Sequence, residues 1–335
     1  MGSLFWHQVR TRQLAVTERY AWASALQAGA VIASADAGAD RWLWNFEGYR
    51  PGGVCKAEIA AKVYSMQFAQ SDDGTRIAYE THGSGGLKLI LLHGWGGSSS
   101  YWRDLVSHLN FEGLQIIAPS YRGHGDSDKP ATGYTLDQFA EDVLAVADAV
   151  GAQRFVLVGF SMSGKFAQYI AAVHPHRVLG LVLIAPVPAS EFPVPADIAK
   201  AWCDTQKDRG AAFNQILAPF TKIPVRRELT ERFLDDFAKA ARLGLEETLN
   251  MCGATFAEQA KKIRVPTLVL AGSYDPLLTT DMLKATTLTQ IVGARMVTLP
   301  CGHEMPQEMP EQTAALLEAF LSGLGHAADV EAAAG

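Results

Sequence analysis

The chain has 335 residues, of which 48% are hydrophobic and 19% charged, so it can bury a core large enough for one α/β domain with additions. Its net charge of −6 and its scattered Lys and Arg residues give no basic footprint, so nucleic acid is not an expected partner. No uninterrupted apolar run reaches about 18 residues, so no membrane span is expected. The four cysteines lack C-x-x-C spacing, which predicts reduced thiols in a cytoplasmic protein without a metal site.

Residues 1–62 form an N-terminal extension outside the regular pattern of the remaining chain. Its Arg-rich start and Ala-rich continuation resemble a targeting segment only loosely, because Glu18 and Gln27 interrupt it. We expect a helical extension. An extension of this kind can cover a pocket or mediate contacts in an oligomer.

From residue 63 the pattern is that of short strands, and the first two runs, VYSMQF and RIAYETHG, can pair as a hairpin. Strands and amphipathic helices then alternate through LKLILLHG, LQIIAPS, RFVLVGF and VLGLVLIAP. Such alternation predicts an α/β fold, with a mostly parallel eight-stranded sheet flanked by helices.

A long helical stretch at 191–262 separates these strands from two later ones, PTLVLAG and ARMVTLP. It is too long for a loop, so we expect a helical cap inserted into the domain. The predicted division is therefore an extension at 1–62, a core at 63–190 and 263–325, the cap at 191–262 and a C-terminal tail at 326–335.

Ser161 lies in VGFSMSGK, directly after a predicted strand and before a predicted helix. A nucleophilic serine on a strained strand-to-helix turn needs small neighbours, and Gly159 and Ser163 are small. Small-residue turns are common, so this match alone is a weak signal. A serine also needs an imidazole to take its proton and a carboxylate to orient that imidazole.

Asp275 and His303 follow the last two predicted strands, at their carboxyl ends, in the chain order Ser, Asp, His. Taken singly, Asp275 reads as a turn or helix-cap residue and His303 as a loop histidine. Their joint order predicts a catalytic triad of Ser161, Asp275 and His303, and Glu191 is the first alternative acid.

The turn after LILL, with the sequence HGWGG, predicts the site that stabilises an oxyanion. The backbone N–H groups of Trp95 and of Met162 are the candidate donors. A phosphate-binding loop is the alternative, but the turn has neither G-x-G-x-x-G nor Gly-Lys-Ser/Thr. His93 is interpreted as structural and His124 as a solvated loop residue. No chemical role is expected for Lys165 or Cys301.

With these motifs, residues 64–325 resemble the α/β-hydrolase superfamily, and GFSMSG and HGW are most similar to its esterases, lactonases and non-haem haloperoxidase-like perhydrolases. SYRGHGDSDKP is similar to the superfamily's loop after the fourth strand, with Ser120 in place of the usual first Asp. Ser161 excludes the dehalogenases and epoxide hydrolases, which use an Asp nucleophile.

The resemblance implies a cofactor-independent serine hydrolase of small to medium apolar esters or lactones. The alternatives are a C–C bond hydrolase or perhydrolase with the same triad, or a slow-turnover ligand receptor. The cap is rich in aromatic residues, which suit an apolar pocket but serve equally well as ordinary cap core. We expect Trp202, Phe220 and Met251 to bind substrate.

Overall fold

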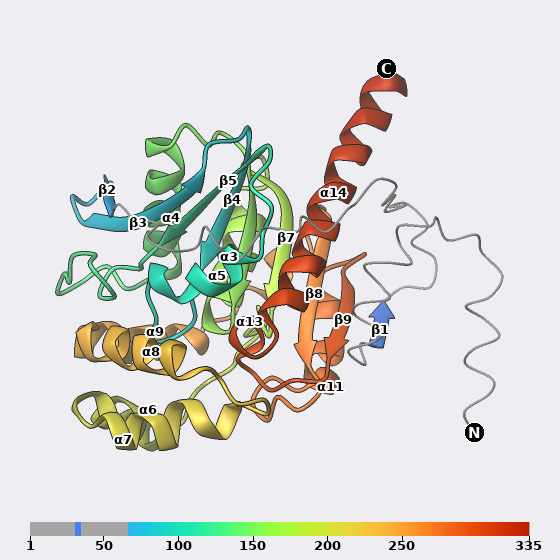
Figure 1. The fold of residues 1–335 in the computed structure, drawn as a ribbon. Helices are drawn as coiled ribbons and strands as arrows, with labels where there is room; N and C mark the ends of the chain where they lie inside the picture. The colour runs from blue at the N-terminus through green and yellow to red at the C-terminus, as the bar shows by residue number, and fades with distance from the viewer. Residues whose placement is uncertain (1–30, 35–65, 335) are drawn as a thin grey trace, which may run out of the picture.

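The computed structural model describes residues 31–34 and 66–334, with side chains for residues 66–324. A twisted sheet forms the centre of the fold, with helices on both faces and a group of helices across one end (Figure 1). Nearly all of the predicted N-terminal extension lies outside the described residues. Its described part, 31–34, is a strand and not the expected helix.

The sheet has nine strands in the order β1-β9-β8-β7-β6-β4-β5-β3-β2. Strands β4 to β9 pair with one another in parallel. Strands β2 and β3 form the expected antiparallel hairpin, β3 pairs antiparallel with β5, and β1 pairs antiparallel with β9. The eight strands expected for the core are therefore present, and β1 adds a ninth at one edge. The strands are β1 (Val31–Ser34), β2 (Gln67–Gln70), β3 (Arg76–Gly83), β4 (Leu87–Leu92), β5 (Leu114–Pro119), β6 (Phe155–Phe160), β7 (Val178–Ile184), β8 (Thr267–Gly272) and β9 (Arg295–Leu299).

Both faces of the central strands are buried, which explains why these strands read as continuous apolar runs. Successive side chains of a strand point to opposite faces, so β4 contributes to two cores. Ile90 and Leu92 belong to one core cluster, and Leu89 and Leu91 belong to the other.

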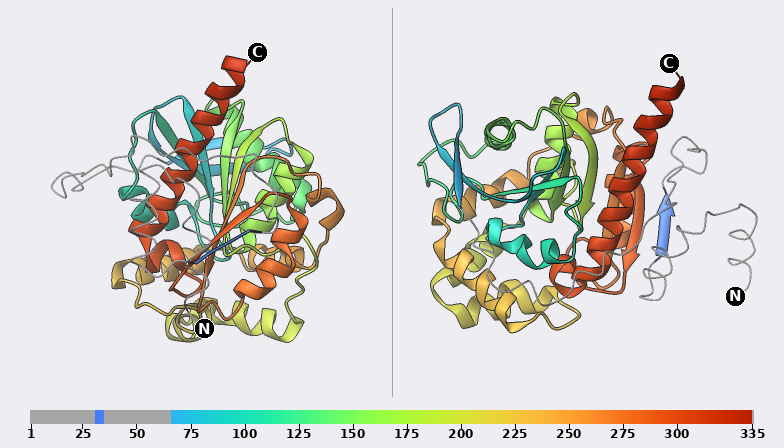
Figure 2. Two further views of the ribbon diagram at one scale, coloured as in Figure 1. Left: turned by 90° about the vertical axis from the view of Figure 1, so that its right-hand side faces the viewer. Right: turned by 45° about the horizontal axis from the view of Figure 1, so that its top comes forward.

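Helices α4, α5, α11 and α12 pack on the first core, and α3, α13 and α14 pack on the second (Figure 2). Thr135 caps the amphipathic helix α4 by accepting a hydrogen bond from the Gln138 N–H. The helices of the two layers are η3 (Ser99–Trp102), α3 (Arg103–Ser107), α4 (Leu136–Ala149), α5 (Met162–Val173), α11 (Thr280–Ala285), α12 (Thr287–Gln290), α13 (Met305–Glu308) and α14 (Pro310–Ala334).

Short helices fill the segment between β7 and β8 and lie across the carboxyl ends of the strands (Figure 1). They have a small apolar core of their own, which includes Phe233, Phe237 and Leu245. We call this segment the cap. Its elements are α6 (Ala196–Asp204), η4 (Thr205–Lys207), α7 (Arg209–Ala212), η5 (Phe213–Leu217), η6 (Ala218–Phe220), α8 (Arg227–Lys239), α9 (Arg242–Cys252) and α10 (Ala257–Ala260).

In the described part of the chain, no helix is both long enough and apolar enough to cross a membrane. The longest, α14, has 25 residues and packs its first half against the sheet.

Candidate active site

Ser161 lies at the sharp turn between β6 and α5, with φ of 56° and ψ of −119°. A positive φ is strained for a residue with a side chain and persists only where the surroundings enforce it. A Cβ added at Gly159 would lie 2.5 Å from the Ser163 carbonyl oxygen, and one at Gly164 would lie 2.4 Å from the Cβ of Pro186. The small residues of VGFSMSGK therefore let strand and helix approach closely enough to hold this turn.

Ser163, at the position where glycine is usual, is fully buried and hydrogen-bonded. Its Oγ accepts a hydrogen bond from the Phe160 N–H at 2.8 Å and lies 2.7 Å from the Leu92 carbonyl oxygen and 2.9 Å from that of Phe160. The hydroxyl thus ties the turn to the end of β4, where the next loop of the site begins.

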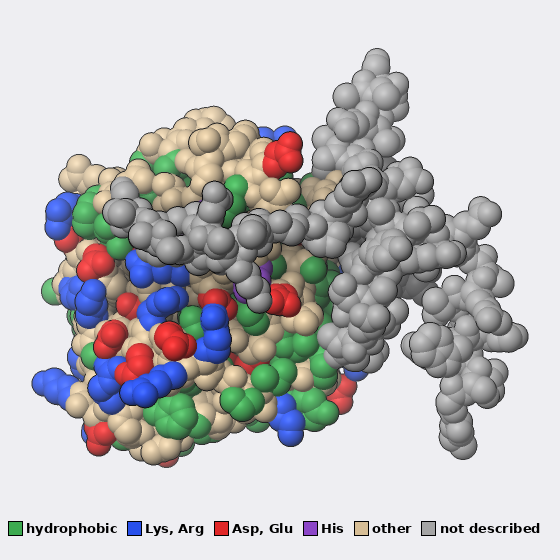
Figure 3. Space-filling model, viewed as in Figure 1, with side chains coloured by type: hydrophobic (Ala, Val, Ile, Leu, Met, Phe, Trp, Pro, Cys, Tyr) green, Lys and Arg blue, Asp and Glu red, His purple; other side chains and the backbone are tan. Residues whose placement is uncertain are grey.

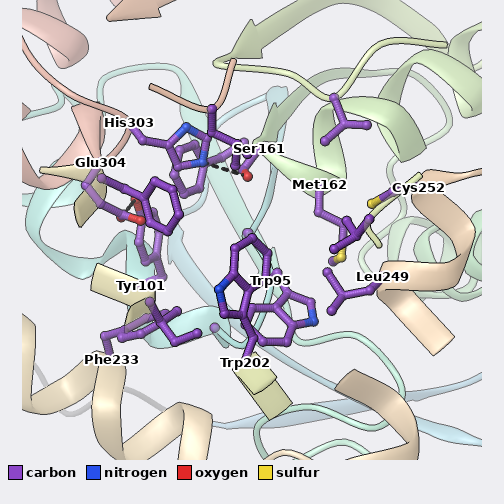
Figure 4. A pocket seen from close by; sticks show the side chains of 18 of the residues that line it. Trp95, Tyr101, Ser161, Met162, Trp202, Phe233, Leu249, Cys252, His303 and Glu304 are labelled. Carbon is purple, nitrogen blue, oxygen red and sulfur yellow. Dashed lines mark hydrogen bonds between the residues drawn. The ribbon is translucent and has the colours of Figure 1, made fainter. Parts of the chain in front are cut away.

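His303 and Asp275 meet Ser161 at the carboxyl ends of β6, β8 and β9. Figure 4 shows His303 beside Ser161. His303 Nε2 lies 2.8 Å from Ser161 Oγ, and His303 Nδ1 lies 2.7 Å from Asp275 Oδ2. Asp275 Oδ1 also accepts hydrogen bonds from the N–H groups of Leu277 and Leu278, at 2.8 and 3.0 Å. Glu191, the alternative acid, is exposed at the surface.

The pKa values of the pair shift in opposite directions. Burial alone would raise the pKa of Asp275, but His303 and the two backbone N–H groups outweigh it and lower that pKa. Burial alone would lower the pKa of His303, but Asp275, with smaller contributions from Glu304 and Glu308, raises it above 6.5. The carboxylate therefore stays ionised and favours the tautomer with a proton on Nδ1, which leaves Nε2 free to accept a proton.

The turn after β4 presents the Gly94–Trp95 peptide to the same space. His93 Nδ1 lies 2.8 Å from the Gly94 carbonyl oxygen, and the Tyr121 N–H donates to His93 Nε2. Burial lowers the pKa of His93 to about 3, so its ring is neutral, and the Tyr121 bond assigns the proton to Nδ1. In a trans peptide the N–H points opposite to the carbonyl, so the Trp95 N–H points away from His93.

Met162 is the first residue of α5, where helix geometry leaves the backbone N–H without a partner inside the helix. Trp95 and Met162 both line the pocket that contains Ser161. Both predicted oxyanion donors thus belong to residues that line the pocket of Ser161.

A pocket of about 730 Å³, including its open mouth, surrounds Ser161 and His303 (Figure 4). Of the three residues predicted to bind substrate, Trp202 and Phe220 line this pocket and Met251 does not. Met251 is buried in the main core, while Leu249 and Cys252 of the same helix face the pocket. Other apolar side chains of the lining are Phe160, Val187, Phe192, Val194, Ile216, Phe233 and Leu277.

Residues 89–230 match the family model described as alpha/beta hydrolase fold. The chain is 30% identical to a putative non-heme chloroperoxidase of Synechocystis sp. over 264 residues, which cover 73% of this chain and 94% of the relative. The chain belongs to the α/β-hydrolase superfamily.

Two further similarities lie within this superfamily. A bifunctional esterase/perhydrolase of Acinetobacter calcoaceticus is 28% identical over 277 residues, which cover 76% of this chain and 99% of the relative. An esterase from Exiguobacterium antarcticum has a similar structure, with a TM-score of 0.69 and 26% identity, over 76% of this chain and 99% of the esterase.

Glu308 of this α/β-hydrolase holds the His303 loop, a role that sequence reasoning missed. Its Oε2 accepts hydrogen bonds from the N–H groups of Gly302, Lys222 and Ile223, and its Oε1 accepts one from the Glu304 N–H. The His303 N–H donates to the Phe220 carbonyl oxygen at 2.7 Å. The cap and the histidine loop are therefore joined through backbone groups, which carry no side-chain signal in the sequence.

His124 is fully buried and not solvated as expected, and its ring lies 5.5 Å from that of His93. Burial lowers its pKa to about 4. Ser120 is buried beside this loop, where its Oγ accepts a hydrogen bond from the Ser99 N–H. Through this hydrogen bond, the loop with Ser120 in place of the usual Asp holds the segment that follows the HGWGG turn.

Lys165 is also fully buried, one turn after Ser161 in α5. Its Nζ donates to the carbonyl oxygens of Pro188, Ser190 and Cys252 at 2.8 to 3.0 Å, and so ties both ends of the cap to this helix. Burial lowers its pKa to about 8. Among residues 31–34 and 66–334, no group of three His, Cys, Asp or Glu side chains is arranged to hold a metal ion.

Proposed function

We propose that this α/β-hydrolase cleaves carboxylic esters or lactones of small to medium apolar substrates through an acyl-enzyme. The observation that carries the proposal is the hydrogen-bonded series from Ser161 through His303 to Asp275, which opens into an apolar pocket. This series has the geometry of an activated nucleophile, its base and the group that orients the base.

In the first half-reaction Ser161 Oγ attacks the ester carbonyl carbon while His303 Nε2 takes the hydroxyl proton. Asp275 stabilises the imidazolium that forms. His303 then gives the proton to the leaving alkoxide, so the alcohol departs and the acyl group stays on Ser161. In the second half-reaction water replaces the alcohol, and the same proton transfers release the acid and regenerate the serine.

The N–H groups of Trp95 and Met162 are the donors for the oxyanion in both steps. Donors that are fixed before the reaction need no reorganisation as charge develops, and each contributes roughly 3 kcal/mol of transition-state stabilisation in enzymes of this type. His93 holds the Gly94–Trp95 peptide through the Gly94 carbonyl, and the start of α5 holds the Met162 N–H.

The lining of the pocket supports an apolar substrate without a negative charge. Of the described residues that line it, none is Lys or Arg, and most are aromatic or aliphatic. On the face shown in Figure 3, Lys and Arg are interspersed with Asp and Glu, so this face carries no field of a single sign. We further propose that the cap at 191–262 closes over the substrate and keeps out long polymers.

Measuring kcat/KM for p-nitrophenyl esters from acetyl to decanoyl tests this function. Each methylene buried in an apolar pocket contributes about 0.8 kcal/mol, or about fourfold in kcat/KM, until the pocket is full. A rise of this size followed by a plateau supports the proposal. A flat profile, or a preference for anionic esters, contradicts the apolar acyl pocket.

Perhydrolysis is a second candidate, because the relative from Acinetobacter calcoaceticus is named an esterase/perhydrolase. Hydrogen peroxide would replace water in the second half-reaction, giving up its proton to His303 and leaving as the peracid. Peracetic acid formed from acetate and hydrogen peroxide is measured by its oxidation of iodide. A rate no higher than that of the Ser161→Ala variant excludes this activity.

A further inference from the structure

The apolar pocket contains one polar pair outside the proposed triad, Tyr101 and Glu304. Both line the pocket, and they are only 5% and 7% exposed. The Tyr101 hydroxyl donates to Glu304 Oε2 at 2.8 Å, and the Tyr101 ring stacks on Phe160 with 5.1 Å between ring centroids. Packing and hydrogen bonding thus fix the carboxyl group in place at the edge of the site.

The second carboxyl oxygen, Glu304 Oε1, has no hydrogen-bond partner among the described residues. This oxygen is not fully buried and belongs to a residue that lines the pocket, so it can accept a hydrogen bond from a molecule bound there. Burial raises the pKa of Glu304, partly opposed by His303 and by the Tyr101 hydrogen bond. A donor from the substrate would lower that pKa again.

The position of the pair indicates which part of the substrate it faces. Figure 4 shows Glu304 and Tyr101 on the His303 side of Ser161, with Met162, Leu249 and Cys252 on the other side. His303 must hand its proton to the leaving oxygen, so the alcohol part of an ester lies on the His303 side.

We propose that Glu304 and Tyr101 form a polar subsite for a hydroxyl group on the alcohol part of the substrate, so that the preferred esters are monoesters of diols or polyols. The inference rests on the proposed ester hydrolysis. A hydroxyl suits the subsite better than an ammonium group for two reasons. An ammonium is far more costly to bring into an apolar pocket, and its charge would repel the imidazolium that forms at the neighbouring His303.

Two matched pairs of esters test the subsite. In 2-hydroxyethyl butanoate and n-propyl butanoate, a hydroxyl replaces a methyl group on the alcohol part. In ethyl 3-hydroxybutanoate and ethyl 3-methylbutanoate, the same exchange is made on the acyl part. We measure kcat/KM by acid release for all four esters with the wild-type chain and with the Glu304→Gln and Glu304→Met variants.

We expect the wild-type chain to prefer 2-hydroxyethyl butanoate over n-propyl butanoate by about 10- to 100-fold, the range for a hydrogen bond to a charged group. The acyl pair should show no such preference. Glu304→Gln keeps an acceptor and should retain part of the ratio, whereas Glu304→Met should bring it to about one. A role of Glu304 in tuning His303 alone would change both esters of a pair equally and leave their ratio intact.

A wild-type ratio near one, or a ratio that persists in Glu304→Met, overturns the subsite. A preference confined to the acyl pair overturns its placement on the alcohol side. These outcomes differ from failure of the proposed function, in which none of the four esters is hydrolysed and Ser161 does not react with a phosphonate probe. The wild-type ratio decides the question even if a variant does not fold.

Discussion

Replacing Asp275 with Asn changes one atom of the site and should reduce turnover strongly. Asp275 Oδ1 accepts two backbone hydrogen bonds, from Leu277 and Leu278, and Oδ2 faces His303 Nδ1. An amide can keep both backbone bonds only if its oxygen takes the Oδ1 position. The opposite orientation would leave two buried N–H groups facing an NH₂ group, at about 1–3 kcal/mol each.

The amide NH₂ therefore faces His303 Nδ1, which must then act as an acceptor. This places the imidazole proton on Nε2, so that Nε2 cannot take the proton of Ser161. We expect kcat to fall by about 10³- to 10⁴-fold, which corresponds to roughly 4 to 5.5 kcal/mol of transition-state free energy. The fold should be retained, since the backbone bonds survive.

The assay is kcat for p-nitrophenyl butanoate, with the thermal unfolding midpoint as the check on folding. Asp148→Asn is the matched control, because Asp148 is exposed and, within the described part of the chain, its side chain pairs only with Arg177 at the surface. Its kcat should stay within about twofold of the wild-type value, as expected for a surface substitution. Turnover by folded Asp275→Asn close to that of the control would refute the assignment of the acid.

Three other predictions follow from the same structure. Because the pKa of His303 is raised and the neutral imidazole is the active form, kcat/KM should rise with pH through a midpoint above 6.5; a midpoint below 6.5 in a pH–rate profile would show that the carboxylates around His303 do not outweigh its burial. Lys165→Met removes three hydrogen bonds to carbonyl oxygens, of which the Cys252 oxygen keeps a second donor in the Phe192 N–H, so chemical denaturation should show a loss of about 2–4 kcal/mol in the free energy of unfolding, with KM raised more than kcat is lowered; unchanged stability would refute the tie between the cap and α5. Deletion of residues 1–60 removes β1 from the edge of β9 but no residue of the proposed chemistry, so kcat/KM should stay within about threefold; a folded, inactive product would place the extension in the site.

The sequence was sufficient to predict the sheet and the three residues that meet at its carboxyl ends. Ser161, Asp275 and His303 each follow a strongly apolar run, and parallel strands bring such ends to one edge. Hydrophobic periodicity and turn residues are local signals, so they were enough to locate strands that are buried along their whole length. The strand at 31–34 was missed because its pairing with β9 depends on a partner more than 260 residues away in the chain.

The cap was harder to predict because its helices are short and irregular. In α9, Leu249 and Cys252 face the pocket while Met251 packs in the core, and a helix of 11 residues between two cores has apolar residues on more than one face. Glu308 accepts hydrogen bonds from backbone N–H groups of the distant cap and of its own loop, and backbone groups leave no trace in residue type. Such contacts become visible only when the chain is folded.

The most direct test of the account is the mass of the intact chain after reaction with a fluorophosphonate. The account predicts one phosphonyl adduct per chain, located on Ser161 by peptide mapping, because the Ser161 hydroxyl is hydrogen-bonded to His303 in the pocket. The adduct and the ester hydrolysis should both be absent from folded Ser161→Ala. An adduct or ester turnover at the wild-type level in that variant would show that another residue is the nucleophile.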